Sequence, residues 1–150
     1  MLFCNFSCRL AVFTDVWANS KALLFARKSA KAAGHDICSI EDVVLPARQS
    51  VLVSTGIAIQ LPENTYGQIA PRSGLSVKGV DVGAGIIDED YRGEIKVLLR
   101  NQSDEEIRLR KSERIAQLLV LPILYPLVVG SSDLSDTERG ESGFGSSGTV

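Results

Sequence analysis

The sequence predicts one all-β domain, a sandwich or barrel of short strands, followed by a polar C-terminal arm. The 150 residues, 45% of them hydrophobic, are enough to bury one core. Short apolar runs recur with turn residues between them, as in sandwiches and barrels. From Gly130 the composition shifts to Ser, Gly, Asp, Glu and Thr. We therefore expect the core to span residues 1–129 and the arm residues 130–150.

Five apolar or alternating runs, each closed by a turn signal, predict strands of this domain. The first two end at Pro62 and Pro71, since proline cannot donate to a central ladder. Between residues 106 and 110 the alternation is clean and directs Ile107 and Leu109 inward. The expected strands are residues 51–61, 67–70, 94–100, 106–110 and 114–121.

The N-terminal third is harder to assign. Residues 1–13 are mildly apolar, include Arg9 and lack a clear cleavage site, so we interpret them as a strand rather than a signal peptide. Residues 16–33 are rich in Ala, Leu, Lys and Arg, and both a helix and an extended segment remain open. No run approaches the ~20 apolar residues of a membrane span. We expect no membrane partner and a cytoplasmic or nuclear location.

Charge and cysteine content exclude several classes of function. The net charge of −2 shows no basic excess, so direct nucleic-acid binding is not expected. The three cysteines, Cys4, Cys8 and Cys38, match no zinc spacing, and His35 is the single histidine. A Cys/His metal site is therefore excluded, and the thiols are expected to be free in a reducing compartment.

Residues 83–93 read Gly-Ala-Gly-Ile-Ile-Asp-Glu-Asp-Tyr-Arg-Gly, shortly after the basic turn at residues 71–74. Carboxylates at 88–90 are costly to bury unpaired, and the flanking glycines mark tight turns or close approach to a ligand. A carboxylate that acts as a general base needs such a fixed seat. Taken alone, Asp88 also fits a solvated turn and Tyr91 a half-buried strand aromatic.

Two readings of the C-terminal segment remain open from composition alone. It is either a disordered tail or a flexible arm that binds an anion. Residues 139–148, Arg-Gly-Glu-Ser-Gly-Phe-Gly-Ser-Ser-Gly, combine nest-forming glycines, hydroxyl donors and the bidentate cation Arg139. They lack the lysine and helix of a Walker A loop. The isolated Phe144 suits stacking on a base.

Five short segments stand out together: residues 33–37 (Ala-Gly-His-Asp-Ile), 71–75 (Pro-Arg-Ser-Gly-Leu), 85–93, 114–118 (Arg-Ile-Ala-Gln-Leu) and 139–148. In this order they resemble the five motifs of the trimeric dUTPase (deoxyuridine triphosphate nucleotidohydrolase) family. The resemblance covers roughly residues 32–148. It implies a jelly-roll-like β-clip protomer in a homotrimer, with shared active sites and an arm that crosses to a neighbouring subunit.

The resemblance also implies a reaction, the Mg²⁺-assisted hydrolysis of dUTP to dUMP and pyrophosphate. Such an activity limits uracil incorporation into DNA and supplies dUMP for thymidylate synthesis. Asp88 matches the aspartate that activates the water attacking the α-phosphorus, and Asp36 the aspartate that holds the metal through water. This is general-base catalysis of an in-line displacement.

The other matching positions are implied to contact the substrate. Those facing the phosphates are Arg72, Ser73, Gly74, Gln117, Arg139, Gly145, Ser146 and Ser147. Those at uracil are Gly85, Ile86, Ile87 and Lys96 through main-chain groups, with Phe144 as a lid. Tyr91 packs under the deoxyribose, where a 2′-hydroxyl would clash.

Several residues depart from the family pattern. Ser142 replaces a usual glycine of the arm, and the side chain of Lys96 must point away from uracil. His35 is expected to be a surface or half-buried histidine, and Arg114 a structural ion-pair partner. The loop before the first motif lacks the usual proline and glycines and carries Phe25, Lys28, Ala30 and Lys31 instead.

Two alternative functions remain to be weighed. A dCTP deaminase on the same fold needs a glutamate base and a cytosine pocket, and the block at residues 88–91 fits dUTP hydrolysis better. A catalytically impaired dUTPase-like trimer would act as a binding or signalling module. Retention of the motif residues Asp36, Asp88, Tyr91, Arg139 and Phe144 argues against it.

Deleting every residue after Asp133 tests the role predicted for the arm. The truncated protein should fold and bind dUMP weakly but hydrolyse dUTP very slowly, because Arg139 and Phe144 can no longer close over the nucleotide. Pyrophosphate release and dUMP titration measure both properties. Full activity of the truncated protein would contradict a catalytic arm.

Overall fold

The computed structural model describes residues 17–18 and 27–141, and in these residues almost every element is a strand. This confirms the all-β prediction. The strands are β1 (Trp17–Ala18), β2 (His35–Cys38), β3 (Val43–Leu45), β4 (Ser50–Ser54), β5 (Ile57–Ala58), β6 (Thr65–Ala70), β7 (Val80–Gly83), β8 (Ile86–Ile87), β9 (Lys96–Asn101), β10 (Ile107–Leu109) and β11 (Arg114–Pro122), with the short helix α1 (Ser73–Ser76).

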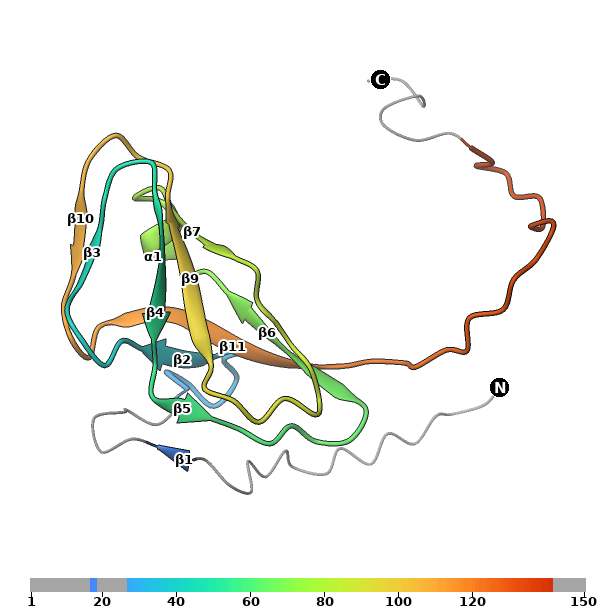
Figure 1. The fold of residues 1–150 in the computed structure, drawn as a ribbon, viewed down its shortest axis with the longest axis horizontal. Coiled ribbons are helices and arrows are strands. Elements are labelled where there is room, and N and C mark those ends of the chain that lie inside the picture. The colour runs from blue at the N-terminus through green and yellow to red at the C-terminus, as the bar shows by residue number, and fades with distance from the viewer. Residues whose placement is uncertain (1–16, 19–26, 142–150) are drawn as a thin grey trace.

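All strand pairs are antiparallel (Figure 1). A four-stranded sheet has the order β2-β11-β6-β8, and a three-stranded sheet has the order β4-β9-β7. The pairs β10-β3 and β1-β5 complete the described strands. β11 is central, because it pairs with β2 on one side and β6 on the other, and so joins segments far apart in sequence.

The core follows the two-residue period of the strands. In β9, Val97, Leu99 and Asn101 are buried, whereas Lys96 and Arg100 are exposed. In β10, Leu109 is buried and Ile107 packs against the core, so their predicted inward orientation is confirmed. One continuous apolar cluster connects the two larger sheets.

The predicted strands are present, with different ends. The expected strand at 51–61 divides into β4 and β5, since Gly56 between them has a positive φ of 69°. The sequence analysis did not predict the short strands β3, β7 and β8 or the four-residue helix α1, which has no side-chain cap. Elements of two to four residues are too short to display a hydrophobic period.

The N-terminal predictions are tested only in part. The strand expected at residues 1–13 lies outside the described residues, as do Cys4 and Cys8. Within the open segment 16–33, residues 17–18 form a strand and residues 27–33 form bends and turns, so neither described part is helical. Within the described residues, no helix is long and apolar enough to cross a membrane.

After β11 the chain runs away from the sheets (Figure 1). This exit segment, residues 123–129, is apolar, yet after Ile123 its side chains are exposed: Leu127 is 93% and Val128 97% exposed. Residues 130–141 are exposed throughout and contain no strand or helix. The boundary between core and arm at 129/130 stays a prediction.

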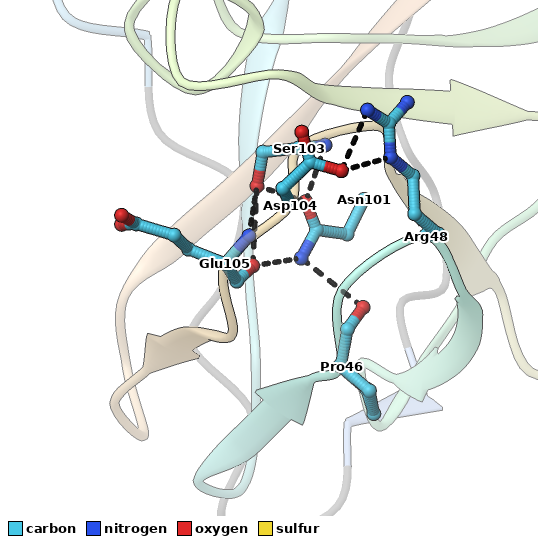
Figure 2. A network of polar contacts seen from close by, with 6 residues as sticks. All are labelled: Pro46, Arg48, Asn101, Ser103, Asp104 and Glu105. Atoms are coloured by element: carbon cyan, nitrogen blue, oxygen red, sulfur yellow. Dashed lines mark hydrogen bonds and ion pairs between the residues drawn. The ribbon is translucent and has the colours of Figure 1, made fainter.

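A buried asparagine fixes the turns at one end of the three-stranded sheet (Figure 2). The Asn101 amide donates to the carbonyls of Leu45, Pro46 and Glu105 at 3.0, 3.1 and 2.8 Å. Its Oδ1 accepts from the backbone N–H and the hydroxyl of Ser103 at 3.0 and 2.7 Å. Since Asn101 is only 2% exposed, water cannot replace these partners.

Asn101→Ala should lower the free energy of unfolding by about 3 kcal/mol, because several buried backbone groups lose their partner. Urea unfolding at fixed protein concentration measures the change. Asp104→Asn is the matched control, since it removes only the exposed ion pair with Arg48, 2.7 Å long, and should cost about 0.5 kcal/mol or less. Equal losses in the two variants would contradict the role assigned to Asn101.

Candidate active site

The first group of predicted site residues gathers around Asp36 on β2, whose side chain is 18% exposed. Its Oδ1 lies 3.4 Å from Arg72 Nε, and its Oδ2 accepts a 3.0 Å hydrogen bond from Arg114 Nη1. The ion pair expected of Arg114 is therefore present. One carboxylate between two guanidinium groups leaves one positive charge in excess, which suits a phosphate ligand.

The basic turn of the second motif is fastened to β11. Arg72 Nη1 donates to the Arg114 carbonyl at 2.8 Å, and Gln117 Nε2 donates to the Pro71 carbonyl at 2.9 Å. A Cβ at Gly34 would lie 2.7 Å from Gln117 Oε1 and 3.0 Å from Gln117 Cβ, so a side chain at residue 34 would displace this amide. Gln117 thus holds the turn in place, in addition to the phosphate-facing role predicted for it. Ser73 and Gly74, which open α1, are exposed.

The second group lies on the hairpin that carries the acidic block. β8 pairs with Gly67 and Gln68 of β6, and Ile69 N–H donates to the Gly85 carbonyl at 2.8 Å. Gly85 has a φ of 136°, and a Cβ there would lie 2.8 Å from the Ile69 carbonyl oxygen. The backbone therefore approaches β6 more closely than any residue with a side chain allows. This contact fixes the position of Ile86 and Ile87.

Asp88 follows β8 directly and is exposed. Its carbonyl accepts the Tyr91 N–H at 3.1 Å, which closes the turn at residues 88–91. Tyr91 is 44% exposed, and its hydroxyl donates to the Glu94 carbonyl at 2.9 Å. Lys96 opens β9 opposite Ser54 and its side chain is exposed. The hairpin thus presents the Asp88 carboxylate and the Tyr91 ring on a backbone held by hydrogen bonds.

An open pocket of about 580 Å³ adjoins this hairpin. Tyr125 at its edge donates to Glu89 Oε2 at 2.8 Å, and this hydrogen bond raises the pKa of Tyr125 because it requires the protonated phenol. The clustered carboxylates disfavour a triphosphate here. The residues lining the pocket are Tyr66, Ile86, Asp88, Glu89, Asp90, Ile123 and Tyr125, none of which belongs to the Asp36 group.

His35 and Cys38 flank Asp36 on β2. Burial raises the pKa of the Cys38 thiol, and the nearby Asp36 charge raises it further, so the thiol stays protonated at neutral pH. Burial lowers the pKa of His35, as does the charge of Arg27, whose Nε donates to His35 Nε2 at 3.2 Å. His35 is half-buried, as expected, and its imidazole is neutral at neutral pH.

The arm residues are the least described part of the predicted site. Arg139 lies in an exposed turn near the end of the described residues. Ser142, Phe144, Gly145, Ser146 and Ser147 lie outside them, so their roles stay predictions. The sequence analysis missed Tyr66 and Tyr125, because no motif or spacing connects them to this hairpin. It also missed Glu94, which directly follows the third motif but whose contact with Gly56 is not visible in the sequence.

The fold and the two groups define an all-β enzyme of the kind that binds an anionic nucleotide. The family model described as dUTPase matches residues 20–148. The chain therefore belongs to the dUTPase family, which confirms the resemblance of the five motifs.

Named relatives and solved structures agree with this assignment. The deoxyuridine 5′-triphosphate nucleotidohydrolase of Paramecium bursaria Chlorella virus 1 is 54% identical over 123 residues, 81% of this chain and 87% of that protein. The enzyme of the same name from Oryza sativa is 48% identical over 131 residues, 87% of this chain and 77% of that protein.

Among solved structures, a Staphylococcus bacteriophage 80alpha dUTPase G164S mutant with dUpNHpp superposes with a TM-score of 0.84 at 30% identity. The superposition covers 89% of this chain and 97% of that one. The predicted jelly-roll-like β-clip class is thereby confirmed for the protomer.

The lowered pKa of His35 predicts a loss of stability in mild acid. Unfolding frees the imidazole to take a proton near pH 6.5, whereas the folded chain resists protonation until lower pH. Stability from this residue is therefore full above about pH 6.5 and declines as the pH falls. Between pH 7.5 and 5.5 the urea midpoint of the native chain should fall further than that of His35→Gln. Identical pH dependence in both proteins would contradict this.

Proposed function

We propose that this chain hydrolyses dUTP to dUMP and pyrophosphate, as a dUTP diphosphatase of nucleotide metabolism. Membership of the dUTPase family over residues 20–148 is the observation that carries the proposal. The chain spans 87% and 77% of the two relatives described above, so it includes most of an enzyme that bears this name. The identity of the compartment, cytoplasm or nucleus, stays a prediction from the sequence.

Asp88 acts as the general base. Its carboxylate is exposed at a turn closed by the Tyr91 N–H, so it can accept a hydrogen bond from a water molecule. The water oxygen attacks the α-phosphorus in line and its proton passes to Asp88. The bond from the α-phosphorus to the bridging oxygen breaks, and pyrophosphate leaves with that electron pair. The proton on Asp88 then returns to solvent.

Arg72 contributes the positive charge that holds the phosphates, together with the exposed turn at Ser73 and Gly74. The hydrogen bonds from Arg72 to the Arg114 carbonyl and from Gln117 to the Pro71 carbonyl orient this turn before the substrate arrives. Preorganised charge stabilises the transition state without reorganisation during the reaction. Arg139, Gly145, Ser146 and Ser147 complete the phosphate site from the arm, and Phe144 covers uracil.

The acidic residues of the described chain are consistent with a Mg²⁺ ion that the substrate phosphates, rather than the protein, mainly bind. Among the described residues, no three His, Cys, Asp or Glu side chains form a group that would hold a metal by themselves. Mg²⁺ commonly binds through one or two carboxylates, water and substrate phosphates, and Asp36 beside the Arg72 turn would hold the ion through water. When bound, the ion offsets charge on the triphosphate.

Tyr91 and the hairpin backbone select the nucleotide. Tyr91 packs under the deoxyribose, so the 2′-hydroxyl of UTP has no space. Main-chain groups of Gly85, Ile86, Ile87 and Lys96 read uracil, and the close contact of Gly85 with β6 makes this hairpin rigid. We therefore expect dUTP to be preferred over both UTP and dTTP.

A homotrimer with shared active sites accounts for two features of the single chain. The pocket beside Asp88 is lined by none of the residues of the Asp36 group, which supports an arrangement in which a neighbouring copy brings the two parts of the proposed site together. The exit segment, residues 123–129, exposes a run of apolar side chains that solvent disfavours. Contact with a second copy would bury it.

Asp88→Asn tests the proposed chemistry. The variant keeps the shape of the side chain but removes the base, so turnover of dUTP should fall by about 10²–10⁴-fold with nucleotide affinity little changed. Pyrophosphate release with dUTP and Mg²⁺ measures turnover, and dUMP titration measures affinity. Asp104→Asn, at an exposed turn carboxylate after β9, is the control. Near-native turnover by Asp88→Asn would exclude Asp88 as the base.

A further inference from the structure

We propose that Glu94 is a positioning residue that fixes Tyr91 and thereby sets the discrimination between deoxyribose and ribose. The inference rests on the proposed function, because it gives Tyr91 the sugar as its partner. Glu94 acts through Tyr91 and needs no contact with the sugar. Three sets of contacts on the hairpin lead to this assignment.

The first set holds the Tyr91 ring from its polar end. Tyr91 is 44% exposed, so packing alone does not fix the ring. Its hydroxyl donates to the Glu94 carbonyl at 2.9 Å, three residues further along the chain. The orientation of the ring therefore depends on where the backbone places this carbonyl.

The second set of contacts joins the hydroxyl end of the Tyr91 ring to Gly93. A Cβ built at Gly93 would lie 2.6 Å from Tyr91 Cζ and 3.0 Å from Cε2. The hydroxyl end of the ring thus lies against the Gly93 backbone, and a side chain at residue 93 would displace it. Gly93 and the Glu94 carbonyl together form the seat of Tyr91.

The third set fixes Glu94 to the core. Glu94 Oε1 accepts the N–H of the buried Gly56 at 2.8 Å. The next residue, Ile95, donates its N–H to the Ile57 carbonyl at 2.7 Å and accepts from Thr55 Oγ1 at 2.6 Å. The seat is therefore bonded to the junction of β4 and β5, which lies 38 residues away in sequence.

Exclusion of a 2′-hydroxyl by shape requires this rigidity. A clash rejects a substrate only if the clashing group cannot move aside, and small displacements at a site change rates substantially. Loss of the Glu94 carboxylate leaves the buried Gly56 N–H without its acceptor, which favours a shift of the backbone at residue 94. Tyr91 then moves with its seat, and the space for a 2′-hydroxyl opens.

The experiment compares kcat/KM for dUTP and UTP in the full chain with Mg²⁺. In Glu94→Ala the preference for dUTP should fall about fivefold or more, since rejection of an added hydroxyl depends on the fit of the pocket. Glu94→Gln should keep the native preference, because its amide oxygen still accepts the Gly56 N–H. Glu63→Ala, which removes an exposed carboxylate from the turn before β6, is the matched control and should also keep it. An unchanged preference in Glu94→Ala would overturn the proposal.

A second pair of variants separates positioning from general destabilisation. Tyr91→Phe removes the hydroxyl that donates to the Glu94 carbonyl and should lower the preference as well. Because Glu94→Ala is expected to weaken this hydrogen bond indirectly, by displacing the carbonyl, the double variant should lose less than the two single losses combined. The same cycle measured by urea unfolding reports the contact without any substrate. Additive effects in both cycles would overturn the proposal. Absence of dUTP turnover by the native chain would instead refute the proposed function. The unfolding cycle would then still test whether Glu94 and Tyr91 are energetically coupled.

Discussion

The pairing of β11 with both β2 and β6 is the constraint on which the phosphate end of the site depends. It places Gln117 opposite Asp36 on one side and opposite Ala70 on the other, just before the basic turn. The Asp36 carboxylate then meets Arg114 from β11 and Arg72 from that turn. A partly buried charge needs such partners, and loss of one leaves the others uncompensated. The ion pairs thus follow from strand register rather than direct it.

The nucleoside end depends on a different kind of constraint, the close approach of backbone to backbone. Gly85 lies against the Ile69 carbonyl at a distance that excludes a Cβ, and the hydroxyl end of Tyr91 lies against Gly93, where a Cβ would displace the ring. The Glu94 carboxylate then connects the far side of the hairpin to Gly56. A hairpin held at both of its sides has few ways to deform, which suits a pocket that distinguishes substrates by single added groups.

The all-β class and the residues of the motifs were predictable, because alternation, turn residues and motif order are local properties of the sequence. Pairing of β11 with β2 and β6 was not, since register between distant strands depends on tertiary packing. For the same reason the contact of Glu94 with Gly56 and the three carbonyls around the Asn101 amide could not be predicted. Short elements such as β8 and α1 were missed because two to four residues display no period.

Within one chain the two groups of site residues, around Asp36 and around Asp88, lie apart and differ in charge. The Asp36 group has an excess of positive charge, whereas the turn at 88–90 carries three carboxylates, and Coulomb attraction alone would favour their collapse onto each other. The sheets keep them apart: Asp36 is held in β2 at one edge of the four-stranded sheet, and Asp88 follows β8 at the opposite edge. The proposed trimer would bring the Asp36 edge of one copy to the Asp88 edge of another. A substrate with anionic phosphates at one end and a neutral base at the other would then lie between two unlike surfaces, which the sheets of this chain keep apart.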